Sequence, residues 1–293
     1  MASNIDDRSA DIAAGIIAAE AAPSDWHVHF KLGCAYLNHN MFSEAVEPFE
    51  RARGLDGSQV ATHLNLSVAL TNSGDGRAGE SAARTAIALD PSSRGYFCLG
   101  NALRQQGQPK AAAEMFRKHL ELDPLDALAH CNLGLALGHA GHHQDALGEF
   151  VTVLQDRPRD FKALHGASIA LFRLGDYEGA ISMLRRACEV DATDTEVWLT
   201  LGSCFMRTER FVEALVAFER VLAIDPDNVG GNYNQVATLI NLGRAADALV
   251  HAERALNLGP EHSEVATLLE IARKSTSTQP TQQTHLADPP PGS

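Results

Sequence analysis

The sequence has few of the residues that nucleic-acid interfaces and disulfide frameworks need. Only 24 of its 293 residues are lysine or arginine, against 37 aspartates and glutamates, so the formal net charge is −13. Affinity for nucleic acid depends on clustered basic side chains that neutralise phosphates, so this balance argues against such a partner. The five cysteines are an odd number without a CxxC pair, which indicates neither a disulfide framework nor a thiolate zinc site.

Long apolar runs are missing as well. No uncharged apolar run approaches the roughly 20 residues that a membrane-spanning helix needs. Residues 1–22 lack a basic leader, and Glu20 interrupts their apolar stretch, so they do not resemble a secretory signal. Together with the cysteine usage, these absences predict a cytoplasmic protein that does not insert into a membrane.

Aromatic residues make up only 6% of the chain while hydrophobic residues reach 45%, which is typical of closely packed helices. A fixed spacing accompanies this composition, because alanine returns every 34 residues at Ala112, Ala146, Ala180, Ala214 and Ala248. A period of this length is the signature of stacked helical hairpins. The sequence therefore predicts seven consecutive repeats, at residues 26–59, 60–92, 93–126, 127–160, 161–194, 195–228 and 229–262.

Within a repeat, numbered from its first residue, the same residue types return at fixed positions. Position 7 is leucine in five repeats and position 8 is small in six, and both share one face of a first helix with positions 4 and 11. Glycine at position 15 in five repeats marks a turn. Small residues at positions 8 and 20 are expected to let the two helices approach closely, while bulky residues at 11 and 24 fill the remaining space.

Repeats such as WHVHFKLGCAYLNHNMFSEAVEPFERARGLDG resemble the tetratricopeptide repeat family over about residues 26–262. The resemblance implies an all-α fold, a right-handed superhelix (α-solenoid) of stacked antiparallel helix hairpins, with a concave groove lined mainly by first helices. Residues 1–25 are expected to form a flexible start and a capping helix, a degenerate half-repeat. A C-terminal capping helix is expected over 263–274, and a disordered, proline-rich tail over 275–293.

The resemblance places positions 2, 5, 6, 9, 12 and 13 of the first helices in this groove. In repeats three to six these positions hold five fixed cations against one fixed anion, Glu196. Such a groove attracts acidic segments over a Debye length of about 8–10 Å. Asparagine at position 6 can also donate to and accept from an extended peptide backbone. The predicted peptide-binding residues are Asn65, Arg94, Phe97, Asn101, Arg104, Asn132, Leu135, Lys162, Ile169, Phe172, Arg173, Arg207 and Asn234.

These features predict a protein–protein interaction scaffold or adaptor that binds a peptide segment of an acidic, partly apolar partner. Three other interpretations stay open. The cations could only keep exposed helices soluble, and the asparagines could serve intramolecular hydrogen bonds. The chain could also be a self-assembling scaffold, a homo-oligomer in which the N-terminal helix of one copy occupies the groove of another. Finally, it could be a co-chaperone with a degenerate carboxylate clamp, in which Asn101, Asn132 and Lys162 are present while Phe97 and Gly166 replace two cations.

No pattern for catalysis or for a cofactor is found in the sequence. It contains neither a phosphate-binding glycine loop nor a nucleophile elbow. His139, His142 and His143 gather at one predicted turn, but without a nearby cysteine or a positioned carboxylate they do not predict a metal site. We therefore expect no enzyme activity, no metal and no cofactor.

Overall fold

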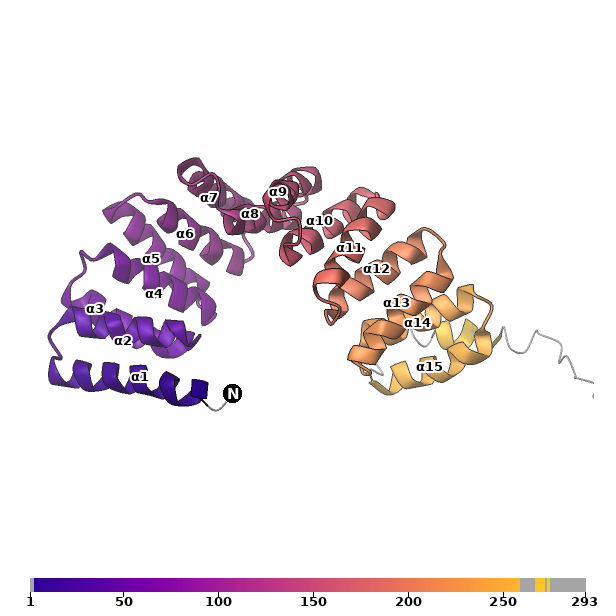
Figure 1. Cartoon of the computed structure of the whole chain (residues 1–293), viewed down its shortest axis with the longest axis horizontal. Helices are drawn as coiled ribbons and strands as arrows, with labels where there is room; N and C mark the ends of the chain where they lie inside the picture. The colour runs from indigo at the N-terminus through magenta and orange to yellow at the C-terminus, as the bar shows by residue number, and fades with distance from the viewer. Residues whose placement is uncertain (1–2, 259–266, 272, 275–293) are drawn as a thin grey trace, which may run out of the picture. The chain divides into compact units, whose positions relative to one another are not determined.

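The computed structural model describes residues 3–258, 267–271 and 273–274, and their regular structure is α-helical throughout (Figure 1). The chain divides into two compact parts, an N-terminal part of residues 1–170 and a C-terminal part of residues 171–293. Each part consists of helix hairpins stacked in chain order, so the expected all-α class is confirmed.

The helices of the N-terminal part are α1 (Ser3–Ala21), α2 (Trp26–Asn38), α3 (Phe42–Leu55), α4 (Val60–Asn72), α5 (Gly76–Leu89), α6 (Ser93–Gln105), α7 (Pro109–Leu122), α8 (Ala127–His139) and α9 (His143–Asp156). Helix α10 (Phe161–Leu174) contains the boundary between the parts. The C-terminal part continues with α11 (Tyr177–Val190), α12 (Thr195–Arg207), α13 (Phe211–Ile224), α14 (Val229–Asn241) and α15 (Ala245–Leu258). The even-numbered helices begin at the residues where the sequence places the start of each repeat.

Helices pack mainly on their neighbours in the chain. In the N-terminal part each helix from α1 to α8 contacts the next one, and α2 also contacts α4, α4 contacts α6, and α6 contacts α8. In the C-terminal part α11 to α15 pack in the same order, and α12 contacts α14. We call the surface of α2, α4, α6, α8 and α10 as far as Ala170 the first-helix face of the N-terminal part. The surface of the rest of α10, α12 and α14 is the first-helix face of the C-terminal part. The second-helix face is the surface of the odd-numbered helices.

The ends of the repeats meet further helical segments. Helix α1 packs on α2, where Ala19 is buried. Residues 267–271 and 273–274 are helical, and Leu269 is buried against Val236 and Leu239. The rest of the predicted C-terminal helix, residues 263–266 and 272, and the predicted tail at 275–293 lie outside the described residues.

Glycine at position 8 makes room for the aromatic ring at position 24 of the same repeat. A Cβ on Gly100 would lie 2.7 Å from the ring of Phe116, and a Cβ on Gly134 would lie 2.8 Å from the ring of Phe150. The same pair recurs as Gly33 with Phe49 and as Gly202 with Phe218. In these four repeats the small residue at position 8 therefore accommodates the aromatic ring at position 24, and this differs from the close approach of the two helix backbones that the sequence predicts.

Position 15 adopts the left-handed conformation in every repeat. Five repeats have glycine there with φ between +71° and +103°. The other two have Asn40 with φ of 57° and Glu209 with φ of 58°. Since this conformation strains residues that carry a Cβ, the shared backbone explains why glycine is the common residue at the turn.

In five of the seven repeats a hydrogen bond from the side chain at position 4 anchors the preceding loop. The ring Nε2 of His29, His63 and His130 lies 2.9–3.1 Å from the carbonyl oxygen six residues earlier. Trp198 and Asn232 donate to the equivalent carbonyl at 2.9 and 3.2 Å. A carbonyl only accepts, so Nε2 carries the proton in all three histidines.

Candidate functional site

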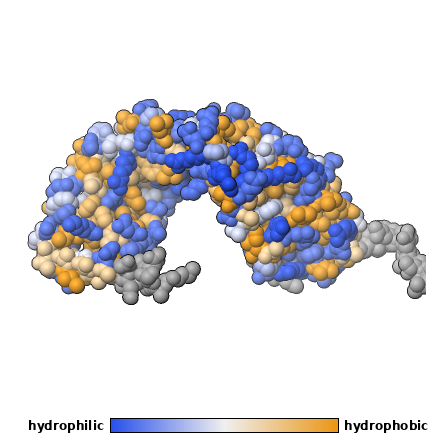
Figure 2. Space-filling model, viewed as in Figure 1, coloured by the Kyte–Doolittle hydropathy of each residue, from blue (hydrophilic) through white to orange (hydrophobic). Residues whose placement is uncertain are grey.

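The first-helix face of the N-terminal part carries an exposed set of cations. Arg94 on α6, Arg104 at the end of α6 and Lys162 on α10 are all exposed. Within the described residues neither Arg104 nor Lys162 forms an ion pair. Figure 2 shows hydrophilic and hydrophobic side chains interspersed over the visible face of this part. These two charges are therefore available to an acidic segment.

Asn65 is engaged by neighbouring repeats. Its side chain is only 8% exposed, its Oδ1 accepts a hydrogen bond from Arg94 Nη2 at 2.8 Å, and its Nδ2 donates to Cys34 Sγ at 3.3 Å. The amide thus connects three successive first helices, α2, α4 and α6. Intramolecular bonding, one of the interpretations left open by the sequence, describes these contacts of Asn65, and its contact with a guest stays a prediction.

Asn101 and Asn132 meet across the next pair of first helices. Asn132 Nδ2 lies 3.5 Å from Asn101 Oδ1, and both side chains are partly exposed. A carboxylate at this place would meet these two amides. The positions at which the clamp pattern has further cations hold Phe97 and Gly166, and both are packed inside the stack. The ring of Phe97 lies 5.7 Å from that of Phe116, and a Cβ on Gly166 would lie 2.4 Å from the ring of Phe150.

The apolar residues predicted on this face differ in exposure. Leu135 on α8 is half-buried, whereas Ile169 on α10 is 40% exposed. Phe97 also packs against the buried His119, with ring centroids 5.3 Å apart. Ile169 therefore offers more apolar surface to a guest than Phe97 does.

The first-helix face of the C-terminal part contains a cluster centred on a residue that the sequence analysis did not select. Tyr177, at the start of α11, accepts hydrogen bonds from Arg207 Nε and Nη2 at 3.1 and 3.0 Å. Its ring also packs edge-on against Phe172 at 5.4 Å. The cluster brings together two predicted residues, Phe172 and Arg207. A tyrosine at position 17 could have been noticed only by pairing it with position 13 of the following repeat.

Two further predicted residues of this part lie apart from that cluster. Arg173 is exposed and forms no ion pair among the described residues. Asn234 on α14 is partly exposed, and its backbone carbonyl accepts a hydrogen bond from Thr238 Oγ1 at 2.6 Å. Both side chains are accessible to a guest.

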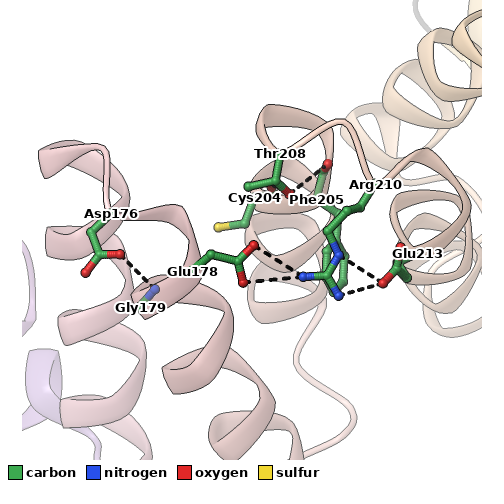
Figure 3. Close-up of polar contacts among 8 residues, drawn as sticks. All are labelled: Asp176, Glu178, Gly179, Cys204, Phe205, Thr208, Arg210 and Glu213. Atoms are coloured by element: carbon green, nitrogen blue, oxygen red, sulfur yellow. Dashed lines mark hydrogen bonds and ion pairs between the residues drawn. The ribbon is translucent and has the colours of Figure 1, made fainter.

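An arginine network joins repeats five and six in the C-terminal part (Figure 3). Arg210 Nη1 lies 3.4 Å from both carboxylate oxygens of Glu178, and Arg210 Nε donates to Glu213 at 2.9 Å. The guanidinium also stacks over the ring of Phe205 at 4.7 Å. The hydrogen bond from Arg210 holds the pKa of Glu213 below its usual range. The charge of Arg210 is thus compensated within the protein.

The five cysteines are free thiols, and burial holds them in the neutral form. Burial raises the pKa of Cys98 to about 11 and that of Cys204 to about 12, where nearby Glu178 adds to the effect. Burial likewise raises the pKa of Cys131 and of Cys188 to about 11. Because the thiolate is the reactive form, these residues are suited to packing rather than to nucleophilic chemistry.

One group of potential metal ligands was not anticipated from the sequence. His119, Asp123 and Asp126 have ligand atoms within 4.8 Å of one another. The two ring nitrogens of His119 already face Ser93 O at 2.9 Å and Asp126 Oδ2 at 3.0 Å, and Asp126 Oδ1 caps α8 by accepting from Leu128 N. Since the imidazole nitrogens are occupied by protein oxygens, we assign this group a structural role.

Family models match most of the chain. A model described as tetratricopeptide repeat matches residues 64–127, 97–161, 131–195 and 165–229, and a second model of the same description matches 205–271. None of the helices described here is long and apolar enough to span a membrane.

Curated relatives are distant and longer. The chain is 22% identical over 255 residues to BBSome complex member BBS4 of Bos taurus, covering 87% of this chain and 43% of that protein. It is 24% identical over 239 residues to the peroxisomal targeting signal receptor of Eremothecium gossypii, covering 78% and 40%. It is 24% identical over 265 residues to protein O-mannosyl-transferase TMTC3 of Homo sapiens, covering 84% and 29%. The chain thus spans less than half of the length of each relative.

A solved structure shows the same fold. The structure of pilF of Pseudomonas aeruginosa superposes with a TM-score of 0.63 at 16% identity, covering 74% of this chain and 99% of that one. At this identity the similarity concerns the arrangement of helices alone.

Proposed function

Because the chain belongs to the tetratricopeptide repeat family, we propose that it is an interaction scaffold that binds an acidic, partly apolar peptide segment on its first-helix faces. Proteins of this family act as scaffolds for protein interactions, and a receptor and a complex member are among the relatives. The proposal includes no reaction. It places the chain in the cytoplasm, where its free thiols persist.

The observation that carries the proposal is the set of unpaired cations on first helices. Arg104 and Lys162 in the N-terminal part, and Arg173 in the C-terminal part, are exposed and form no ion pair within the described residues. They occur in a chain whose net charge is −13. Complementary charge steers an oppositely charged segment and suppresses wrong partners. Ile169, on the same helix as Lys162, supplies an exposed apolar side chain in the N-terminal part.

The test begins with selection of phage-displayed 16-residue peptides on the wild-type chain. The selected peptides are expected to be acidic, and their Kd is expected to rise with salt. A triple variant, Arg104→Glu, Lys162→Glu and Arg173→Glu, should weaken binding at least tenfold and flatten the salt dependence. Selection of neutral or basic peptides would contradict the proposal, as would unchanged binding by the triple variant.

A matched control separates local from global charge. The variant Arg77→Glu, Arg117→Glu and Arg220→Glu changes net charge by the same amount at exposed positions on second helices. It should leave the Kd of the selected peptides within about twofold. Equal weakening by both triple variants would mean that overall charge, and not the first-helix face, determines binding.

Self-assembly remains the second candidate, because α1 exposes apolar surface. Ile17 is 66% exposed and Ile16 is 39% exposed. If α1 docks on another copy, light scattering of the full chain should show a concentration-dependent oligomer that Ile17→Glu abolishes. A monomer at all concentrations would remove this candidate and leave the scaffold proposal unaffected.

A further inference from the structure

The second-helix face changes character in repeat six. Positions 18 and 22 of the second helix are exposed throughout the described chain, so the repeats provide a comparison at equivalent places. In repeats one to five these positions hold no large apolar residue: Ser43 and Glu47, Arg77 and Ser81, Lys110 and Glu114, Gln144 and Gly148, Glu178 and Ser182. Repeat six instead has Val212 and Val216, which are 64% and 53% exposed, and repeat seven has Val250 at position 22, 69% exposed.

This change is not required by the fold. Single exposed apolar residues are normal on protein surfaces. Here, however, five equivalent helices pack correctly with other residues at the same two positions. Figure 2 shows hydrophobic surface gathered over the region where α12 and α13 lie in Figure 1. Exposed apolar patches of this kind mark interaction sites.

A pocket lies beside the two valines of repeat six. It has a volume of about 430 Å³ and is formed by α11, α12 and α13. Trp198, Leu201 and Phe205 line it from α12, and Val212 and Val216 line it from α13. Three charged residues, Arg185, Glu189 and Glu213, also line it. This volume lies within the range of about 300–1,000 Å³ that is typical of ligand pockets. The lining is suited to one bulky apolar group.

The equivalent pocket in the N-terminal part has a different lining. It has about 390 Å³ and is formed by α1, α2 and α3. There the position of Val216 is occupied by Glu47, and Arg51 also lines the pocket. Glu44 lines it at the position that Glu213 occupies in repeat six, so that carboxylate is common to both pockets. The stacking of hairpins therefore produces such a cavity in more than one place, while the residues of repeat six make this one apolar.

Among the charged residues that line the pocket, Glu213 is already paired with Arg210, whereas Arg185 is a cation without an ion pair in the described structure. Arg185 lines the pocket and lies over the ring of Phe205 at 5.8 Å, and it forms no ion pair among the described residues. Arg210, over the same ring, is already held by Glu178 and Glu213 (Figure 3). A guanidinium of this kind pairs with a carboxylate. A partner that inserts an apolar group into the pocket should therefore carry a carboxylate next to it, where Arg185 can pair with that carboxylate.

We propose that this pocket docks a segment of a partner protein that inserts one bulky apolar side chain against Trp198 and Val216 and pairs an adjacent carboxylate with Arg185. Arg185 and Val216 belong to the second helices α11 and α13, and none of the residues proposed for peptide binding on the first-helix faces lines the pocket, so it adds a second binding site. A scaffold with both sites can hold two segments at once.

A fragment titration tests the chemistry of the pocket. The probe is 4-phenylbutyrate, with 4-phenylbutylamine and butyrate as controls for charge and for the ring. Trp198 lines the pocket, whereas Trp26 begins α2 in the N-terminal part, so the two indole N–H signals in an NMR spectrum report the site and an internal control. We expect 4-phenylbutyrate to shift the Trp198 signal saturably, with a Kd on the order of 1–10 mM. Neither control compound should match it, and Trp26 should stay unchanged. Absence of a Trp198 shift, or an equal shift with the amine, would overturn the proposal.

Variants then assign the contacts. Arg185→Gln should raise the Kd for 4-phenylbutyrate at least fivefold, and Val216→Glu should abolish the shift. Ser81→Glu places the same charge at the equivalent position of repeat two and should have no effect. Arg185→Gln alters an exposed side chain, so it keeps the test valid even if Val216→Glu disturbs folding. An unchanged Kd in Arg185→Gln would contradict the proposed carboxylate pairing.

Peptide selection tests the proposed occupant. Phage-displayed peptides eluted by 4-phenylbutyrate should carry an apolar residue close to an acidic one, and they should lose binding to Val216→Glu but bind the first-helix triple variant normally. Peptides that respond to the triple variant instead would assign the binding to the first-helix face. Sedimentation that finds a dimer lost in Val216→Glu would show that a second copy covers the pocket, which overturns the proposal.

Discussion

Repeats two and three have the same backbone plan but fill their interiors differently. In repeat three the buried ring of Phe116 lies over Gly100. In repeat two the residue at the ring position is Ala83, and the repeat contains no phenylalanine, tyrosine or tryptophan of its own. The space is removed instead by close approach of the two helices at Gly79.

The hydroxyl groups of Ser67 and Thr71 lie where the two helices approach each other. A Cβ on Gly79 would lie 2.3 Å from Thr71 Oγ1 and 3.1 Å from the carbonyl oxygen of Ser67. Ser67 Oγ in turn donates to the carbonyl of Gly79 at 2.7 Å. The comparison teaches that the repeat requires a filled interior and does not require a particular side chain to fill it.

The largest expected effect is in repeat three. Phe116→Ala should reduce the free energy of unfolding by about 3–5 kcal/mol, because it removes a fully buried ring and leaves a cavity over Gly100. Urea unfolding measures the change in the free energy of unfolding, and hydrogen exchange shows which helices are destabilised. Protection should fall in α6 and α7 and persist in α4 and α5. An equal loss of protection in both repeats would contradict the idea that only repeat three depends on a buried aromatic ring.

The second effect concerns close approach in repeat two. Gly79→Ala should destabilise the chain by about 1–3 kcal/mol, since the added methyl meets backbone as well as Thr71. Thr71→Ala in the same chain removes the nearest atom and should restore part of the loss. The control is Gly148→Ala in α9, where the methyl meets nothing within 4 Å and should stabilise by up to about 1 kcal/mol. Equal behaviour of the two glycines in thermal unfolding would refute close approach.

The turns should respond alike in both repeats. Gly74 and Gly107 have φ of +103° and +71°, so Gly74→Ala and Gly107→Ala should each destabilise by about 1 kcal/mol. The reverse change, Glu209→Gly at the equivalent turn of repeat six, should stabilise by about as much. Chemical denaturation of the three variants checks this. A clear difference between the first two would show that the interiors also determine turn strain.

The smallest effect concerns the contact between the two repeats. Gln106 Nε2 donates to Glu80 Oε2 at 2.8 Å, and this bond, followed by that from Arg84, lowers the pKa of Glu80. A carboxyl whose pKa is lowered by folding stabilises above its unfolded pKa of about 4.3 and loses that contribution as pH falls through the folded value. Gln106→Ala should raise the pKa of Glu80 measured by NMR. The stability loss near neutral pH should be only a few tenths of a kcal/mol, because the pair is near the surface.

The sequence predicts the parts of the fold that repeat. The 34-residue spacing locates the first helices, and glycine at position 15 locates the turns, because backbone geometry imposes these features on every repeat. Asn40 and Glu209 show the limit of this reasoning, since they adopt the same turn without the residue that signals it.

The candidate site was harder to predict because its contacts join residues about 30 positions apart. Arg94 donates a hydrogen bond to Asn65, and Arg207 donates one to Tyr177, and neither pairing has a local pattern in the sequence. His119 occupies a position where small residues are usual, so its contacts with Ser93 and Asp126 could not be inferred from spacing.

The loop anchor at position 4 has one more implication. Imidazole, indole and carboxamide all donate to the equivalent carbonyl, so this bond requires a proton donor but not a particular group to bear it. Leu164 in repeat five has no donor, so the fold does not require the bond in every repeat. Where the residue is histidine, the environment of the second ring nitrogen, Nδ1, differs between repeats. The Nδ1 of His130 meets Glu149 at 2.6 Å, whereas that of His63 is buried without a partner in the described structure. Two loops between repeats can therefore share the same hydrogen bond from position 4 while the rest of that side chain has different surroundings.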